Sequence, residues 1–201
     1  MTARLKTRIA LTPKAAPFAI RAERASDVVA REALLDASFG ENRQQRTCQR
    51  LRDGRAPAEG LALSALRQGR LIGTVRLWHV SAGGIPALVL GPLAVEASCR
   101  KLGIGAALVR RALAAAKARG HGAVLLLGDV SYYARFGFSA LKTGELRLPG
   151  PFEPDRLLGL ELREGALNGA WGMVVPTGMA AWPQGKPRLA ARSRKLAPRA
   201  A

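Results

Sequence analysis

The sequence predicts a mixed α/β domain whose sheet is antiparallel in its first half and contains one β-α-β crossover. Three observations carry this prediction. Two apolar segments flank a glycine-containing turn at 68–70, as in a β-hairpin. Almost wholly apolar runs at 87–95 and 123–127 have the composition of strands buried on both faces. Between these runs, residues 103–119 repeat apolar side chains at helical spacing, which gives the order strand, helix, strand.

The first elements of the chain are expected to form a strand followed by two helices. Alternation at 18–21 predicts a short strand, and Ser26 is the expected N-cap of an amphipathic helix from Val28 to Phe39. A second helical stretch at 43–52 is dominated by Gln and Arg. We expect it to lie over the surface where a substrate enters.

The second half of the chain is expected to complete the sheet. A short helix at 132–136 should be followed by a strand that begins at Phe138 and by a last pair of strands near 158–162 and 170–175. Within the buried run at 87–95, the pair Gly91-Pro92 disrupts a strand ladder. We therefore expect a bulge or a splayed strand at that point.

Charge divides the chain into a domain and two basic ends. The net charge is +18, and ten of the 32 Lys and Arg residues lie in 1–17 and 176–201, which contain no acidic residue. The remainder carries +8. A length of 201 residues suits one domain with a substantial core. We expect a disordered basic N-terminus at 1–17, a single domain at 18–176 and a disordered basic tail at 177–201.

Composition argues against several classes of protein. The basic tails could tether nucleic acid or anionic lipid, but a generally Arg-rich composition explains them equally well, so nucleic acid is not the expected partner. The sequence contains no apolar window that is long and uncharged enough to predict a membrane span. The N-terminus also lacks the apolar region of a secretory signal. Cys48 and Cys99 form no CxxC motif, which supports neither a disulfide framework nor a metal site. The expected location is the cytoplasm.

The segment 100–106, Arg-Lys-Leu-Gly-Ile-Gly-Ala, has the features of an anion site. Its glycines allow a close backbone approach, and the first amides of the following helix are unpaired donors at the positive end of the helix dipole. A P-loop is excluded because no Gly-Lys-Ser/Thr ending is present. A Rossmann site fits poorly because Leu108 occupies the third glycine position, although Asp129 lies at a plausible distance for its ribose ligand.

Two motifs together resemble the GNAT superfamily of N-acetyltransferases. The first is Arg100-x-x-Gly103-x-Gly105-Ala106, and the second is the aromatic segment 132–138, which ends in Gly-Phe. The resemblance covers about 18–148. Within the family, the chain looks like a bacterial subgroup of predicted acetyltransferases. It implies a mixed, mostly antiparallel sheet with splayed central strands flanked by helices.

The resemblance also implies an acetyl-CoA site and a direct reaction with a primary amine. The backbone amide of Leu93 would polarise the thioester carbonyl, and Tyr133 would protonate the departing thiolate as a general acid. No metal is implied. The residues expected to bind the cofactor are Leu93, Ala94, Val95, Arg100, Lys101, Leu102, Gly103, Ile104, Gly105, Ala106, Tyr133 and Phe136.

The general base is not evident from the sequence. Histone-type relatives carry a glutamate four residues before the carbonyl-binding position, where this chain has Val89. Glu96, His79, Ser131 and a chain of water molecules are the alternatives.

The leading hypothesis is therefore an acetyl-CoA-dependent N-acetyltransferase that acts on an unidentified small molecule or protein. The alternative is a non-catalytic CoA-binding or nucleic-acid-associated protein that acts through its basic tails. Arg43, Arg46 and Arg50 on the second helical stretch could favour an acidic acceptor. The acceptor itself and a homodimer are left open.

Overall fold

The computed structural model of this chain describes residues 18–181. The expected disordered end at 1–17 and most of the expected tail, 182–201, lie outside the described residues. Residues 177–181, which were assigned to the tail, are hydrogen-bonded to the domain. The Thr177 amide donates to the His79 carbonyl, and the Ala181 amide donates to the Gly54 carbonyl. The ordered domain thus continues for five residues past the expected boundary.

The elements form the mixed, mostly antiparallel α/β class predicted from the sequence. The strands are β1 Ala19–Ala22, β2 Ala62–Arg67, β3 Arg70–Ala82, β4 Ile85–Val95, β5 Ala123–Leu127, β6 Leu146–Arg147, β7 Leu157–Glu161 and β8 Gly172–Pro176. The α-helices are α1 Val28–Phe39, α2 Ile104–Ala118 and α3 Val130–Ala134. Short 3-10 helices are η1 Ala25–Asp27, η2 Glu41–Gln45, η3 Thr47–Leu51, η4 Ala97–Cys99 and η5 Pro154–Arg156.

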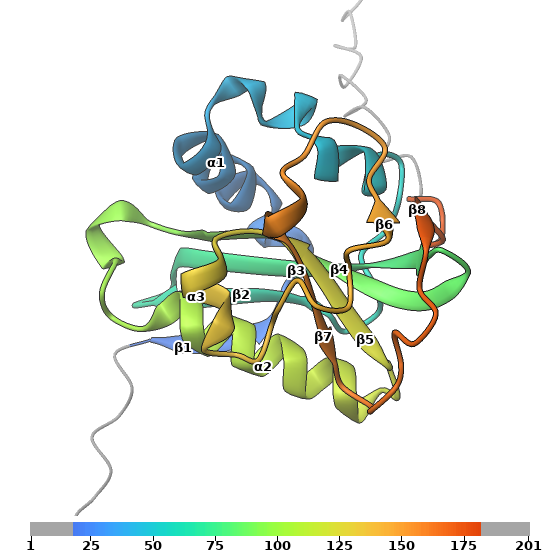
Figure 1. The fold of residues 1–201 in the computed structure, drawn as a ribbon. Helices are drawn as coiled ribbons and strands as arrows, with labels where there is room; N and C mark the ends of the chain where they lie inside the picture. Colours follow the sequence, from blue (N-terminus) through green and yellow to red (C-terminus); the bar gives the residue numbers. More distant parts are fainter. Residues whose placement is uncertain (1–17, 182–201) are drawn as a thin grey trace, which may run out of the picture.

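The sheet has the strand order β1-β2-β3-β4-β5-β7. All neighbours on this path are antiparallel except β4 and β5, which α2 connects as the predicted β-α-β crossover. Strand β8 pairs with the far end of β3 and also with β6. Helix α2 covers one face of the sheet, and α1 with η2 and η3 lies over the other (Figure 1).

The predicted hairpin between β2 and β3 is confirmed. Its two central residues, Gln68 and Gly69, have φ angles of 50° and 77°. Two consecutive residues with positive φ are the signature of a type I′ turn, whose twist matches that of the flanking strands. The turn therefore fixes the register in which the antiparallel half of the sheet begins.

The N-cap residue of α1 is Asp27, and not Ser26 as predicted, and the Asp27 side chain belongs to the capping box of the preceding 3-10 helix η1. Its carboxylate accepts the Arg24 amide at 2.9 Å, the Ser64 hydroxyl at 2.9 Å and the Arg21 guanidinium at 2.6 Å. The Arg21 guanidinium is the largest cause that holds the pKa of Asp27 far below its usual range. The carboxylate therefore joins β1, β2 and the start of η1 through these three charge-assisted bonds.

The expected helix at 43–52 is instead two short 3-10 helices, η2 and η3. Arg46 between them is extended, with φ −67° and ψ 143°. The segment is fastened by its side chains to a distant loop, since Thr47 donates to the Pro151 carbonyl and Arg50 donates to the Pro149 carbonyl. These long-range bonds replace the continuous helical ladder that the local sequence predicts.

The strand expected from Phe138 is reduced to a single bridge between Ser139 and Gly159. The chain then turns, because the Thr143 hydroxyl donates to the carbonyls of Ala140 and Leu157 at 3.1 and 2.6 Å. The last two predicted strands, β7 and β8, are confirmed. Within 18–181, no helix combines the length and the apolar content needed to cross a bilayer.

Replacing Leu108 by Ala tests the packing of α2 on the sheet. Leu108 is completely buried, and a Cβ atom on Gly73 of β3 would lie only 3.1 Å from its Cδ1 atom. Loss of this contact should lower the free energy of unfolding by about 2–5 kcal/mol in urea denaturation. Leu141→Ala, at a site that is 90% exposed, is the control and should change it by less than about 0.5 kcal/mol. Equal effects of the two substitutions would contradict this packing.

Candidate active site

Strands β4 and β5 part in the middle of the sheet. They pair only through Leu88 with Val124 and Val89 with Leu125, although both strands continue further. On its other side β4 stays paired with β3 up to Val95. Beyond Val89, one edge of β4 therefore faces a gap and not a neighbouring strand.

A β-bulge marks the point of divergence, as the sequence predicted. Leu90 pairs with Leu77 and Leu93 with Val75, so Gly91 and Pro92 together oppose a single residue of β3. Gly91 has a φ of 140°, which only glycine adopts readily, and the Gly91–Pro92 peptide is cis. The Trp78 indole donates to the Gly91 carbonyl at 2.6 Å and fixes the bulge from the next strand.

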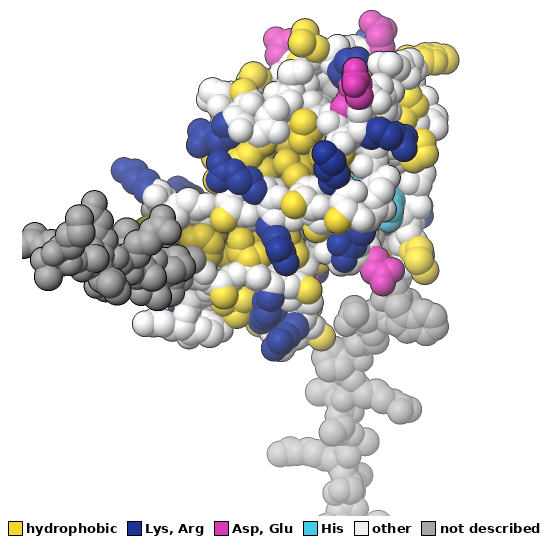
Figure 2. Space-filling view, turned by 90° about the horizontal axis from the view of Figure 1, so that it is seen from below, with side chains coloured by type: hydrophobic (Ala, Val, Ile, Leu, Met, Phe, Trp, Pro, Cys, Tyr) yellow, Lys and Arg dark blue, Asp and Glu magenta, His cyan; other side chains and the backbone are white. Residues whose placement is uncertain are grey.

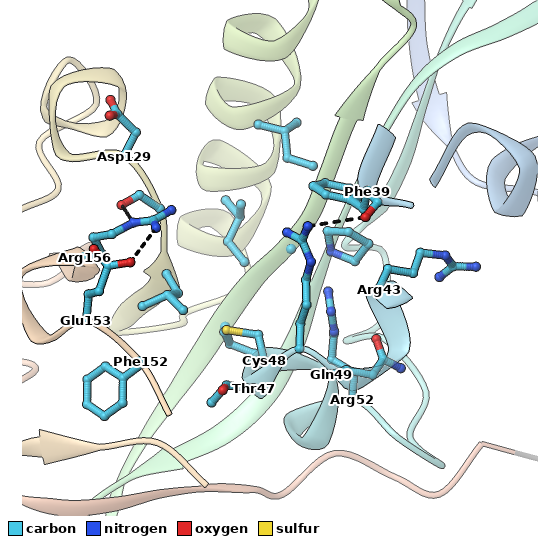
Figure 3. Close-up of a pocket in the computed structure, with 18 of the residues that line it drawn as sticks. Phe39, Arg43, Thr47, Cys48, Gln49, Arg52, Asp129, Phe152, Glu153 and Arg156 are labelled. Atoms are coloured by element: carbon cyan, nitrogen blue, oxygen red, sulfur yellow. Dashed lines mark hydrogen bonds and ion pairs between the residues drawn. The ribbon is translucent and has the colours of Figure 1, made fainter. Parts of the chain in front are cut away.

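A cavity of about 610 Å³ opens at this divergence. It is lined by residues 89–93 of β4 and by 127–129 with Tyr133 on the side of β5 and α3. The end of α1 with η2 and η3 forms one wall, and the loop at 151–156 forms another. Figure 3 shows Gln49 and Arg52 on the first wall, opposite Asp129, Glu153 and Arg156, whereas the Arg43 guanidinium on the same wall points away from them.

Tyr133 is half-buried at the side of this cavity. Its ring packs edge-on against Phe138, with a centroid distance of 5.8 Å, and against Gly128, where any Cβ atom would overlap it. Burial raises the pKa of Tyr133 to about 12, and its hydroxyl has no hydrogen-bond partner among residues 18–181. A protonated phenol without a partner therefore stands beside the splayed strand.

Asp129 holds the helix that carries this tyrosine. Its carboxylate caps α3 by accepting the Tyr132 amide at 2.6 Å and also accepts the Ser131 hydroxyl at 2.6 Å. The Ser131 hydroxyl, and after it the Tyr132 amide, lowers the pKa of Asp129. The carboxylate is thus ionised and occupied by its own helix.

The loop before α2 has the geometry of an anion cradle. Lys101 and Gly103 have positive φ angles of 70° and 76°, and Gly103 is the N-cap of α2 without a capping side chain. The first amides of α2 therefore have no partner within the helix. Arg100, Lys101 and Leu102 are exposed around this turn, and Ile104 anchors it in the core. Figure 2, viewed from below Figure 1, shows Lys and Arg side chains across this face with few acidic ones, which favours an anionic ligand.

The remaining predicted residues extend from the cradle toward the cavity. Leu93 and Val95 are half-buried, and Ala94 between them is buried. Gly105 and Ala106 belong to the first turn of α2 and are half-buried. Phe136 is also half-buried, with the Arg110 guanidinium 5.5 Å from its ring centroid.

Tyr132 is a residue of this region that the sequence analysis missed. A Cβ atom on Gly105 would lie 2.9 Å from the Tyr132 hydroxyl, so this hydroxyl stands directly over the cradle. The Arg135 guanidinium lies 4.6 Å from the Tyr132 ring centroid. The sequence feature that could have indicated this role is the adjacent position of Tyr132 and Tyr133 in one short helix. Neighbouring helix residues point in different directions, which allows the pair to reach the cradle and the cavity.

Comparison with known proteins identifies the family. The profile of the acetyltransferase (GNAT) family matches residues 28–138. This chain belongs to the GNAT family. It is 31% identical over 157 residues to the uncharacterized N-acetyltransferase YhbS of Escherichia coli, and the match covers 77% of this chain and 93% of YhbS. The family assignment and the class of acyltransferase enzyme predicted from the two motifs are thereby confirmed.

Solved GNAT structures have the same fold. The structure of YhbS from Escherichia coli in complex with CoA superimposes with a TM-score of 0.71 at 31% identity, over 83% of this chain and 93% of that one. A GNAT acetyltransferase from Brucella melitensis in complex with acetyl-CoA gives a TM-score of 0.54 at 27% identity, over 71% and 95% of the two chains. The splayed GNAT sheet expected from the sequence is therefore confirmed.

Three of the predicted candidates for a base in this GNAT chain do not line the cavity. Glu96 binds Arg70 at 2.7 Å, and this partner lowers its pKa. His79 lies 5.3 Å from His121, centroid to centroid, at a separate cavity of about 200 Å³. Ser131 is engaged with the helix cap described above.

The carboxylates that do line the cavity were not candidates from the sequence. They are Asp129, which caps α3, and Glu153, which binds Arg156 at 2.9 Å. Nothing in the sequence near Glu153 marks it, because the loop at 151–156 reaches the cavity only through the fold. Among residues 18–181, no group of three or more His, Cys, Asp or Glu is arranged to hold a metal ion.

Alkaline titration of Tyr132→Phe tests the environment of Tyr133, which is then the only tyrosine in the chain. Burial disfavours the phenolate, so its ultraviolet absorbance should develop with a midpoint at about 12. In the unfolded chain this phenol ionises near pH ~10. The contribution of the buried phenol to the free energy of unfolding is therefore complete below that pH and is lost as the pH rises from there to the folded pKa. A midpoint near ~10 while circular dichroism reports an intact fold would contradict the burial of this ring.

Proposed function

We propose that this GNAT chain transfers the acetyl group of acetyl-CoA to a primary amine within a ternary complex. The observation that carries the proposal is the convergence of three features on one cleft: the uncapped start of α2, the splayed edge of β4, and the phenol of Tyr133. The solved relatives bound to CoA and to acetyl-CoA agree with this ligand. Cytoplasmic location remains a prediction from the sequence.

Acetyl-CoA would bind along the line from the cradle to the cavity. The amides of 101–106 would hold the pyrophosphate, with Arg100 and Lys101 as nearby cations. The backbone of Leu93 and Val95 would pair with the amides of the pantetheine arm, because this edge of β4 lacks a partner strand. The thioester would then lie at the cavity, next to Tyr133.

The reaction would proceed by direct attack of the amine nitrogen on the thioester carbon. The Leu93 amide would donate to the carbonyl oxygen, which becomes negative as the C–N bond forms. When the C–S bond breaks, the thiolate of CoA would take the phenolic proton of Tyr133. A phenol whose pKa is about 12 is protonated at neutral pH, as this role requires.

The amine must also lose a proton during the reaction. Glu96, His79 and Ser131 do not line the cavity. Of the proton acceptors that the sequence suggested, only a chain of water molecules remains. We propose that water in the open cavity carries this proton to solvent.

Tyr133→Phe should lower kcat by about 100-fold or more, because the thiolate then departs without a proton donor. The dissociation constant of acetyl-CoA, measured by calorimetry, should stay within about twofold, since the ring still fills its place. Turnover is followed as free thiol release with a panel of primary amines, and Leu141→Ala serves as the surface control.

An unchanged kcat in Tyr133→Phe would remove the phenol from the mechanism. Binding of acetyl-CoA to the unmodified chain without turnover of any amine would instead favour the non-catalytic CoA-binding alternative.

Gly105→Ala tests the cradle independently of turnover. The added methyl group would stand 2.9 Å from the Tyr132 hydroxyl, so the tyrosine must move across the anion site. CoA affinity measured by calorimetry should fall by about tenfold. Gly144→Ala, where a Cβ atom meets nothing within 4 Å, is the matched control and should leave the affinity unchanged. Equal affinities of the two variants would refute the location of the cradle.

A further inference from the structure

The cavity beside the splayed strand has a positive lining. Six arginine and carboxylate side chains line it: Arg43, Arg46, Arg52, Arg156, Asp129 and Glu153. Cations exceed anions by two among these lining side chains, but the carboxylates of Glu32 and Asp36, which do not line the cavity, neutralise Arg43. What matters for a ligand is therefore which of the four arginines has no partner of its own.

Three of the four arginines are already engaged. Arg43 binds Glu32 at 2.5 Å and Asp36 at 2.6 Å. Arg156 binds Glu153 at 2.9 Å. The Arg46 side chain donates to the Phe39 carbonyl at 3.3 Å and lies over the Phe39 ring. Arg43 is thus offset by two carboxylates and Arg156 by one, and Arg46 makes a single hydrogen bond to a backbone carbonyl.

Arg52 is different, because its guanidinium has no hydrogen bond or ion pair with any residue in 18–181. Its Nε atom is inaccessible to solvent and unsatisfied. Its Nη1 atom lies 3.7 Å from where a Cβ atom on Gly91 would stand, next to the bulge of β4. Burial is the largest cause that lowers the pKa of Arg52. A desolvated cation without a counter-ion is unfavourable, and an oxyanion ligand would relieve this cost.

The position of Arg52 separates this site from the phosphates of CoA. The cradle follows the C-terminal end of β4, whereas Gly91 lies toward its middle, before the carbonyl-binding position at Leu93. Two residues of a strand span at most roughly 7 Å. An anion bound at Arg52 would therefore belong to the acceptor, close to the nitrogen that attacks.

We propose that the acceptor is a small primary amine that carries an oxyanion a few bonds from its nitrogen, and that Arg52 binds this oxyanion. The guanidinium fork matches a carboxylate or a phosphate with two parallel hydrogen bonds. The inference rests on the proposed acetyltransferase function and specifies its substrate class. Of the arginines that the sequence suggested for an acidic acceptor, Arg50 does not line the cavity, and Arg43 is neutralised by its two carboxylates.

Matched short amines test the proposal on the full chain. The probes are 3-aminopropanoate, 2-aminoethyl phosphate, propylamine and 1,3-diaminopropane, and the proteins are wild type, Arg52→Met and Arg50→Met. Arg50 lies in the 3-10 helix η3, of which Arg52 is the C-cap, and it is exposed, does not line the cavity and donates only to the Pro149 carbonyl, so it is the matched control.

In the wild type and in Arg50→Met, kcat/KM should be higher for an anionic amine than for propylamine, and lowest for the diamine. Arg52→Met should remove this preference through KM, by about 10- to 100-fold for the anionic amines, and should change kcat/KM for propylamine much less. The anionic probe with the higher kcat/KM shows whether the acceptor's oxyanion is a carboxylate or a phosphate. The Tm of ligand-free Arg52→Met should stay equal or rise, because a half-buried charge without a hydrogen-bond partner has been removed.

Several results would overturn the inference. A preference of the wild type for propylamine or the diamine would do so. An equal fall in kcat for all amines in Arg52→Met would also do so, because it would assign Arg52 to the tetrahedral intermediate.

Failure of the proposed function is distinguishable from failure of this inference. If no amine is acetylated, calorimetry of the CoA-saturated protein with 3-aminopropanoate and with 2-aminoethyl phosphate still tests the site. Binding that Arg52→Met abolishes and Arg50→Met retains would support the oxyanion site. Binding that is absent, or equal in the three proteins, would refute it.

Discussion

The parting of β4 and β5 after two residue pairs is the constraint on which the rest of the molecule depends. A buried strand edge without a neighbour leaves amides and carbonyls unpaired, which is unfavourable unless a ligand or water satisfies them. The bulge at Gly91 and Pro92 produces the divergence, and the indole of Trp78 holds it in place. The cavity and the exposed backbone of β4 are two results of this one departure from a regular sheet.

Helix α3 links the two ends of the cleft. It is only five residues long, and its single side-chain cap is Asp129. Its adjacent tyrosines serve different places, with Tyr132 over the first turn of α2 and Tyr133 beside the cavity. The aromatic contact between their rings, 4.9 Å from centroid to centroid, joins the two places mechanically. A ligand that moves one ring must therefore affect the other.

The sequence predicted the fold best where structure is determined locally. The turn at Gln68 and Gly69, the spacing of α2 and the strand breakers at Gly91 and Pro92 each act through neighbouring residues, and each was read correctly. The two 3-10 helices at 41–51 were missed because bonds to a loop about a hundred residues away shape them. Arg52 was missed for the same reason. Its significance lies in the absence of partners within the described fold, which no local pattern encodes.

Strand β3 has a consequence for how the chain is made. It pairs with β2 and β4, its neighbours in sequence, but its last residues, 80–82, also pair with β8 near the end of the domain. During synthesis the three-stranded antiparallel unit can assemble early from nearby contacts, whereas this edge must wait until 172–176 leaves the ribosome. An uncovered strand edge is a template for pairing with other chains. The nascent protein thus exposes an uncovered strand edge at 80–82 until β8 has emerged.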